Sequence, residues 1–301
     1  MSCPLCKHAD CRKIFVLRQS PTPAVCRCPG CGGEFLVPQP SDEALAKLYS
    51  ASYYDAWGLR DPGMARSVEA MKLATFRLRI ALIRRFVPAG RILDVGCATG
   101  YFLQAAMEAG FEAHGVEFSP YSAAIAQERF GTDRVFHGVL EESPHAPGSL
   151  DVMAMSDLLE HVRDPLATLT YAAGLLRPEG VLMVMTPDTG SFTRKVLGFR
   201  WTHYKPEHLF YFNRKSMENL AALAGLRVVH QEPAIKFLNL AYFNHQFRIY
   251  PNALFTPVFS LLGRLLPAAL LRRNLPLTIG EGIWVLEKPE LPTATHSRNG
   301  I

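Results

Sequence analysis

The sequence predicts an α/β protein organised around a mainly parallel sheet, and three observations lead to this fold class. Short apolar runs alternate along the chain with segments of helical spacing, the pattern of successive strand–helix–strand units. The central run, 92–95, is apolar except at Asp94, as in a strand covered on both faces. Two glycines, Gly96 and Gly100, then precede a helical segment at 101–109. With 301 residues, 49% of them hydrophobic, the chain can bury such a core.

The other elements are expected on either side of this central unit. Ser41 is a suitable N-cap for a first helix, and a longer amphipathic helix over about 65–86 precedes the central strand. Pro120 suits the first turn of a further helix, and Gly225 suits the end of another. The later predicted strands are 111–118, 134–138, 150–155 and 180–188, the last preceded by a helix that ends near Arg177, and strands 226–230 and 282–287 are expected to pair antiparallel and close the sheet.

Four cysteines near the amino terminus have the spacing of metal ligands. They form two C-x-x-C pairs, Cys3 with Cys6 and Cys28 with Cys31, on either side of a segment that predicts a small β-ribbon. Two such pairs suit a closed, tetrahedral zinc site with a structural role, because a catalytic zinc keeps an open position. Cys26 could compete for a ligand position, and a redox dithiol is the alternative.

The turn after the central strand has the features of a nucleoside-binding site. Glycine has no Cβ atom, so Gly96 and Gly100 let a ligand approach the backbone, and the next helix offers free N–H groups. The following strand ends in Glu117, whose carboxylate can accept hydrogen bonds from ribose hydroxyls. A nicotinamide cofactor would need a wider glycine spacing. A glycine turn without any nucleoside ligand is the remaining alternative.

The pattern Asp94-x-Gly96-x-x-x-Gly100, followed by Glu117, resembles the S-adenosylmethionine site of class I methyltransferases. The resemblance implies a Rossmann-like, seven-stranded methyltransferase sheet with a small N-terminal zinc ribbon and a helical C-terminal insertion. It also implies that the turn holds the methionine part of the cofactor and that Glu117 binds the ribose. The family usually has a third glycine in this turn, where the chain has Ala98. The residues expected to contact the cofactor are Asp94, Gly96, Cys97, Gly100, Phe102, Glu117, Phe118, Ser156 and Asp157.

Two segments carry candidate catalytic residues. Glu160-His161 follows a predicted strand, is similar to the family's Leu-Glu-His-Val segment, and is expected beside the transferred methyl group. The segment 199–212 is rich in polar and aromatic residues. Within it, Tyr204-x-x-Glu207-His208 resembles an element of zinc-bearing deoxysugar C-methyltransferases, and the segment also resembles a loop of ubiquinone-type O-methyltransferases.

We expect His208, supported by Glu207, to act as the general base or to bind the acceptor. A second metal ion in this segment is the alternative. For His161, a structural hydrogen bond to the backbone is an equally open interpretation. The expected catalytic residues are His208, Glu207, His161, Tyr204 and His203.

Composition divides the chain into five expected parts. Within 41–90, the layout with paired tyrosines, Tyr53 and Tyr54, resembles a subgroup of small-molecule methyltransferases with N-terminal zinc modules, in which this stretch is similar to a flap over the cofactor. Packing of the two aromatic rings against the sheet is an equally open interpretation. The segment 253–273 is apolar, but proline, glycine and arginine interrupt it, so it is not expected to span a membrane. A lid, a homodimer face and a peripheral membrane contact are open roles for it. The parts are a zinc-ribbon-like module at 1–40, a linker with N-terminal helices at 41–90, the Rossmann-like core at 91–236, an apolar helical insertion at 237–280, and the last strand with a flexible tail at 281–301.

Charge and composition restrict the partners. The formal net charge of +5 is spread without runs of like charge, so a nucleic acid partner is not expected. The expected acceptor is a small molecule, such as a sugar, a lipid-linked compound or a secondary metabolite. An RNA methyltransferase and a non-catalytic protein that binds S-adenosylmethionine and zinc are the alternatives. The first residues show no signal-peptide pattern and seven cysteines suit a reducing compartment, which predicts a cytoplasmic location.

Overall fold

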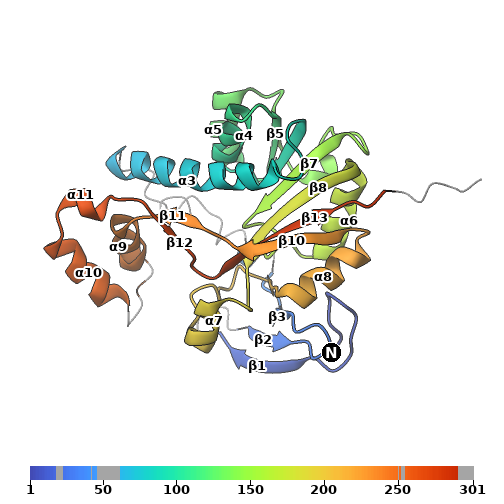
Figure 1. Cartoon of the computed structure of the whole chain (residues 1–301). Helices are drawn as coiled ribbons and strands as arrows, with labels where there is room; N and C mark the ends of the chain where they lie inside the picture. Colours follow the sequence, from blue (N-terminus) through green and yellow to red (C-terminus); the bar gives the residue numbers. More distant parts are fainter. Residues whose placement is uncertain (18–22, 42, 46–61, 250, 252–254, 291–301) are drawn as a thin grey trace, which may run out of the picture.

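A seven-stranded sheet forms the centre of the computed structural model, which describes residues 1–17, 23–41, 43–45, 62–249, 251 and 255–290 (Figure 1). The strand order is β10-β13-β8-β7-β4-β5-β6, with β4 to β8 parallel and β13 antiparallel to both β8 and β10. The predicted sheet and its antiparallel closing pair are therefore confirmed. The strands are β4 (Arg91–Val95), β5 (Glu112–Glu117), β6 (Val135–His137), β7 (Leu150–Ser156), β8 (Leu176–Pro187), β10 (Arg227–Pro233) and β13 (Glu281–Glu287).

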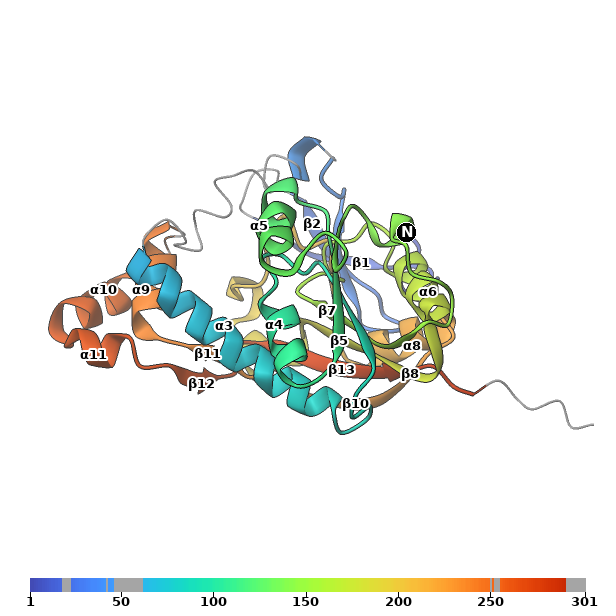
Figure 2. The same ribbon diagram turned by 90° about the horizontal axis from the view of Figure 1, so that it is seen from above.

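Helices cover both faces of this sheet because its strands are apolar on both sides. Along β7, Val152 and Ala154 belong to one core, whereas Met153 and Met155 belong to the other. Figure 2 views the molecule from the face that carries α3, α4 and α5. That face has α3 (Pro62–Ile83), α4 (Tyr101–Glu108) and α5 (Pro120–Phe130), and the opposite face has α6 (Pro165–Leu175) and α8 (Arg214–Leu223).

The boundary between α6 and β8 differs from the prediction. The helix was expected to end near Arg177 and the strand to begin at Gly180. Instead α6 ends at Leu175 and β8 begins at Leu176, which is the partner of Leu150 in β7. The pairing with β7 extends the strand toward its amino end, and the sequence between 176 and 180 carries no sign of this pairing.

The N-terminal ribbon shares a sheet and a core with the rest of the protein. Its strands β1 (Arg12–Val16), β2 (Ala24–Arg27) and β3 (Glu34–Val37) are joined by the short strand β9 (Phe210–Tyr211), which pairs with β3. The cysteines of the ribbon and Phe35 lie in the same hydrophobic core as Phe210 and Phe212. The ribbon is thus packed directly on the segment that carries the candidate catalytic residues.

A helical lobe, residues 236–277, extends from the sheet at the left of Figure 1. The predicted helical insertion in the C-terminal part of the chain is thus confirmed. Strands β11 (Lys236–Leu238) and β12 (Leu275–Leu277) form its stem and enclose α9 (Leu240–Ile249), α10 (Phe255–Leu265) and α11 (Ala268–Leu271). None of the described helices combines the length and apolar character that crossing a membrane requires. The remaining elements are α7 (Phe192–Leu197), η1 (Leu140–Glu142) and η2 (Gly198–Arg200), and the predicted flap at Tyr53 and Tyr54 lies outside the described residues.

Candidate active site

The turn between β4 and α4 has a backbone conformation that favours glycine. Gly96 and Gly100 have φ angles of 77° and 83°, in the left-handed region. A Cβ atom on Gly100 would overlap the ring of Phe130 in α5, so only glycine fits there. Ala98, in the place of the family's third glycine, also has a positive φ of 47°. An alanine held in this region costs roughly 1–2 kcal/mol, so the turn is strained at Ala98.

Glu117 links the end of β5 to this turn. Its Oε2 atom accepts a hydrogen bond from the backbone N–H of Ala98 at 2.8 Å, and its Oε1 atom accepts one from the N–H of Ser119 at 2.8 Å. Burial raises the pKa of the Glu117 carboxyl, and these hydrogen bonds oppose the rise. Each carboxylate oxygen has further acceptor capacity, so Glu117 can still receive the hydroxyl groups of a ribose.

Arg79 on α3 is a candidate cofactor-binding residue that the sequence analysis missed. Its side chain is buried, and Nη1 donates a hydrogen bond to Ser156 Oγ at 3.4 Å. Its Nε and Nη2 atoms have no hydrogen-bond partner within the described part of the chain. Two unpaired N–H groups on a buried guanidinium favour a carboxylate ligand. The sequence did contain an indication that Arg79 is buried. It follows Met71 and Thr75 at intervals of four residues and therefore lies on the same buried stripe of α3.

Carboxylates surround this guanidinium. Burial and the charge of Glu117 raise the pKa of Asp94 well above its ordinary value, and Arg79 opposes the rise. Asp157 accepts a hydrogen bond from Lys236 Nζ at 3.1 Å, and the same ammonium donates to Glu281 Oε1 at 2.7 Å. Burial acts to raise the pKa of Asp157, but the charges of Lys236 and Arg79 outweigh it and lower this pKa. Ser156, the last residue of β7, and Asp157, which follows it, therefore lie beside these ionic groups.

Glu160, His161 and His208 form a buried cluster beyond the carboxyl end of β7. One nitrogen or carboxylate oxygen of each lies within 4.8 Å of the others, and the two imidazole rings meet edge to face with centroids 4.7 Å apart. His161 Nδ1 lies 2.9 Å from the backbone oxygen of Glu207, and His161 Nε2 lies 4.0 Å from Glu160 Oε1. Glu160 Oε2 and His208 Nδ1 are buried and have no hydrogen-bond partner among the described residues. Buried polar atoms are normally paired, so this cluster has the character of a ligand site.

Burial determines the protonation of this cluster. It raises the pKa of Glu160 well above its ordinary value, lowers the pKa of His161 to about 4, and lowers the pKa of His208 well below its ordinary value. Both imidazoles are therefore neutral near pH 7 and can accept a proton. The backbone oxygen of Glu160 accepts hydrogen bonds from the N–H groups of Leu209 and Phe210, at 2.7 and 3.2 Å. These bonds fix the two histidine-bearing segments against each other.

The other three predicted catalytic residues have partners outside the cluster. His203 Nε2 lies 3.0 Å from the backbone oxygen of Ile279, while its ring stacks at 6.4 Å from that of His208. The Glu207 carboxylate lies 4.0 Å from Lys205 Nζ, and the contact of Glu207 with His161 is through its backbone oxygen. The Tyr204 hydroxyl donates to Glu34 Oε2 in the N-terminal ribbon at 2.5 Å and accepts from Arg194 Nε at 3.1 Å.

Three predicted cofactor contacts lie at the margins of the turn. Cys97 and Phe102 are buried beneath it, and the sulfur of Cys97 fills the space that a side chain at Gly115 would need. The ring of Phe118 is 74% exposed next to Glu117 and is free to contact a ligand at the strand end.

The four predicted metal ligands come together at the base of the ribbon. The sulfur atoms of Cys3 and Cys31 are 3.7 Å apart, and those of Cys6 and Cys28 are 3.6 Å apart. A zinc ion with tetrahedral bonds of about 2.3 Å requires sulfur atoms separated by about 3.8 Å. The donor set and its spacing therefore fit a zinc ion, and Cys26 is not one of the four.

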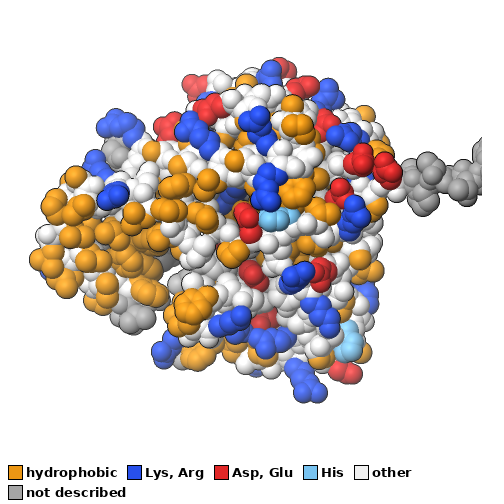
Figure 3. Space-filling model, viewed as in Figure 1, with side chains coloured by type: hydrophobic (Ala, Val, Ile, Leu, Met, Phe, Trp, Pro, Cys, Tyr) orange, Lys and Arg blue, Asp and Glu red, His pale blue; other side chains and the backbone are white. Residues whose placement is uncertain are grey.

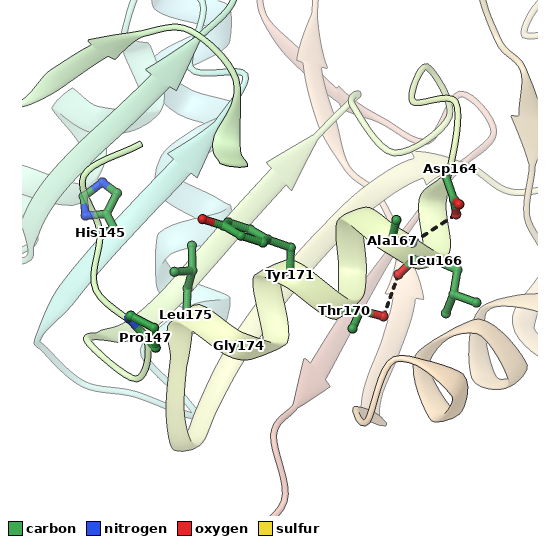
Figure 4. Close-up of a pocket in the computed structure, with 9 residues that line it drawn as sticks. All are labelled: His145, Pro147, Asp164, Leu166, Ala167, Thr170, Tyr171, Gly174 and Leu175. Atoms are coloured by element: carbon green, nitrogen blue, oxygen red, sulfur yellow. Dashed lines mark hydrogen bonds between the residues drawn. The ribbon is translucent and has the colours of Figure 1, made fainter. Parts of the chain in front are cut away.

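A separate hollow of about 650 Å³ lies between α6 and the segment that precedes β7 (Figure 4). Its lining is largely apolar, with His145, Tyr171 and Leu175 around it. None of the predicted site residues lines this hollow. Ligands of open parallel sheets bind beyond the carboxyl ends of the strands, so the turn and the histidine cluster are the candidate active site.

Comparison with known proteins gives a consistent result. A family model described as a methyltransferase domain matches residues 66–231. A ubiquinone biosynthesis O-methyltransferase from Xanthomonas campestris pv. campestris is 30% identical over 194 residues, which cover 58% of this chain and 78% of that protein.

Two solved structures have a similar fold. One is a complex between a methyltransferase activator and a putative methyltransferase from Haloferax volcanii, with a TM-score of 0.53 and 18% identity over 79% of this chain and 98% of that chain. The other is a 1,6-didemethyltoxoflavin-N1-methyltransferase from Burkholderia thailandensis with bound S-adenosylhomocysteine, with a TM-score of 0.52 and 12% identity over 92% of this chain and 100% of that chain. At these identities the likeness shows the shared fold.

Proposed function

Since this chain belongs to the methyltransferase domain family and is a class I S-adenosylmethionine-dependent methyltransferase, we propose that it methylates an oxygen atom of a small-molecule acceptor. The buried cluster of Glu160, His161 and His208 carries this proposal, because it offers neutral imidazoles to an acceptor hydroxyl. Two members of the cluster, Glu160 and His161, come shortly after Leu158 in the chain, and the side chain of Leu158 lies next to Gly96 of the turn. The O-methyltransferase name of the Xanthomonas relative supports oxygen as the methylated atom.

We assign the cofactor contacts to residues from three elements. S-adenosylmethionine supplies, when bound, a methyl group that its sulfonium activates. Arg79 would pair with the carboxylate of the methionine part through its two unpaired nitrogens. Glu117 would accept hydrogen bonds from the ribose hydroxyls, and the glycines of the turn would let the ligand contact the backbone.

His208 is the proposed acceptor of the proton that the acceptor hydroxyl loses. Its imidazole is neutral at pH 7, and the unpaired Nδ1 atom needs no rearrangement of an existing hydrogen bond. Glu160 is in the same cluster, but burial raises the pKa of its carboxyl, so it would have to release its own proton to stabilise the imidazolium that forms. His161 would be a positioning residue, because its Nδ1 bond to the Glu207 carbonyl links the two loops.

A divalent cation in the same cluster is the second candidate, and the unpaired Glu160 oxygen is the observation that favours it. Two histidines and one carboxylate form a three-ligand set that leaves coordination positions open for a substrate. We propose a separate, structural zinc ion for the four cysteines. Metal analysis of the wild type and of the Cys28→Ser and His208→Ala variants distinguishes the arrangements: if the cysteines alone bind metal, only Cys28→Ser lowers the metal content.

Two experiments test the proposed function. In calorimetry, S-adenosylmethionine and S-adenosylhomocysteine should bind the wild type, and Glu117→Ala and Arg79→Ala should weaken both. In turnover assays with labelled S-adenosylmethionine and a panel of phenols, catechols and sugars, an O-methylated product should appear, and His208→Ala should lower kcat far more than it changes cofactor affinity. Methylation at carbon or nitrogen only, or unchanged turnover in His208→Ala, would refute the assignment.

A further inference from the structure

The helical lobe has an apolar surface that no described part of the chain covers. Val258, Leu261 and Leu265 follow one another at intervals of three and four residues and therefore share one face of α10. Their exposed fractions are 48%, 56% and 69%, and Leu270 on α11 adds 50%. Figure 3 shows hydrophobic side chains gathered at the left of the view, where Figure 1 places α9, α10 and α11.

The inner side of α10 is also only partly covered. Phe259 stacks on Phe243 and Phe247 of α9, with ring centroids 5.1 and 5.2 Å apart. None of the described residues of α9, α10 or α11 is buried. In the described residues, α10 and α11 thus form a thin layer of apolar side chains, and an exposed patch of this kind normally contacts another surface.

The charges of the lobe are of one sign. Residues 237–280 contain no aspartate or glutamate and four arginines, Arg248, Arg264, Arg272 and Arg273. All four arginines are exposed. Arg264 comes three residues after Leu261 and lies at the edge of the face that Leu261 and Leu265 share, and Arg272 and Arg273 directly follow α11. An apolar face with arginines at its margin complements a surface that is apolar inside and anionic at its boundary.

We propose that the helical lobe docks on an anionic lipid surface, with α10 lying in the interface between head groups and acyl chains. A helix of 11 residues is too short to span the bilayer but can lie in this region. A second copy of the chain fits less well, because a two-fold contact would bring arginines together without a carboxylate in the patch to pair with them. This proposal is independent of the acceptor and of the methylated atom.

The stem of the lobe connects the docking surface to the active site. Lys236 begins β11, and its ammonium binds Asp157 and Glu281 beside the cofactor site. At the other end of the stem strand, Asn239 Nδ2 donates to Ser67 Oγ of α3 at 2.9 Å. A lobe bound to lipid would therefore be connected directly to residues beside the cofactor site.

Vesicle flotation of the full chain tests the proposal. The wild type should float with vesicles that contain phosphatidylglycerol and bind much more weakly to vesicles of phosphatidylcholine alone. Each basic residue near an anionic surface contributes about 1 kcal/mol, or about fivefold in affinity. The double variant Arg264→Glu, Arg272→Glu should therefore bind the phosphatidylglycerol vesicles about 25-fold or more weakly than the wild type. In the double variant Leu261→Ser, Leu265→Ser, each substitution should lower the affinity for these vesicles about tenfold or more. The matched controls are the exposed Leu223→Ser on α8 and Arg85→Glu after α3, which should bind like the wild type.

One further variant should give a new fluorescence signal on binding, so that the test does not depend only on variants that lose binding. In Leu261→Trp, tryptophan fluorescence should shift to shorter wavelength on addition of phosphatidylglycerol vesicles, and cofactor binding and thermal melting should verify that each variant is folded. Absence of flotation by the wild type would overturn the proposal. Equal binding to both vesicle types would also overturn it, as would a dimer in sedimentation that the Leu261→Ser and Leu265→Ser substitutions dissociate.

Discussion

The hydrogen bond between Tyr204 and Glu34 joins the N-terminal ribbon to the segment that carries His208, and its removal gives the most direct test of the structure. The Glu34 side chain is 1% exposed. Its Oε1 atom accepts from Arg27 and Arg194, and its Oε2 atom accepts from the Tyr204 hydroxyl at 2.5 Å. Tyr204→Phe removes only the hydroxyl and keeps the ring, which contacts Phe15 at a centroid distance of 4.7 Å.

The expected loss follows from this geometry. Phenylalanine leaves a buried carboxylate oxygen without its donor, which costs about 1–3 kcal/mol, near the upper end because the acceptor is charged. For a chain of this length, a loss of about 2 kcal/mol lowers Tm by about 3–4 °C. We expect kcat at a temperature where the variant is folded to change by less than about threefold, because the hydroxyl is bonded to the ribbon and has no contact with the histidine cluster.

Thermal and urea unfolding, with turnover measured in parallel, provide the assay. Tyr171→Phe is the matched control, because the Tyr171 hydroxyl donates to the exposed backbone oxygen of Glu141 at 3.2 Å and its loss should cost less than about 0.5 kcal/mol. Equal stability of the two variants would contradict the structural role of the network. A large fall in kcat of Tyr204→Phe with unchanged stability would instead show the catalytic role that the sequence predicted for this tyrosine.

Three further predictions concern the turn, the histidines and the metal. Ala98→Gly should raise the free energy of unfolding by up to about 1 kcal/mol, because glycine adopts the positive φ without strain. A lower free energy of unfolding for this variant in urea would show that alanine is not strained there. Burial keeps His161 and His208 neutral, whereas the unfolded chain protonates them below about pH 6.5, so stability should fall by about 1.4 kcal/mol per pH unit for each histidine between pH 6.5 and 4. His161→Gln should flatten this dependence in urea unfolding, and an unchanged slope would disprove the explanation. Cys28→Ser should abolish zinc binding at the ribbon and lower turnover more than cofactor affinity, because the cysteines share a core with the strand after His208; normal turnover without zinc would contradict this coupling.

Some features could be predicted because they depend on neighbouring residues. The alternation of apolar runs and helical segments predicted the sheet, and the two C-x-x-C pairs predicted which four thiols meet in the structure. Gly96, Gly100 and Glu117 were recognisable because a turn and the strand after it form one local unit. The end of α6 at Leu175 was less predictable, because strand pairing with β7 decides it.

The arrangement of the active site depended on contacts between distant segments. Arg79 was missed because an arginine on a helix shows no partner in the sequence, and its environment is made by Asp94, Asp157 and Glu281 from three other elements. Tyr204 and Glu207 were grouped with His208 because Tyr204-x-x-Glu207-His208 resembles an element of zinc-bearing deoxysugar C-methyltransferases. The structure instead connects the Tyr204 hydroxyl to Glu34 and the Glu207 backbone to His161.

The sequence by itself determined the order of strands and helices, the glycine turn with its terminal acid, and the thiol ligands. These follow from side-chain spacing and from backbone conformations within a few residues. Only the tertiary structure decided which buried charges meet, that the ribbon and β9 share a sheet, and that two histidines 47 positions apart in the chain lie edge to face. Long-range pairing is fixed by the packing of the whole core, and a linear pattern of residue types does not contain it.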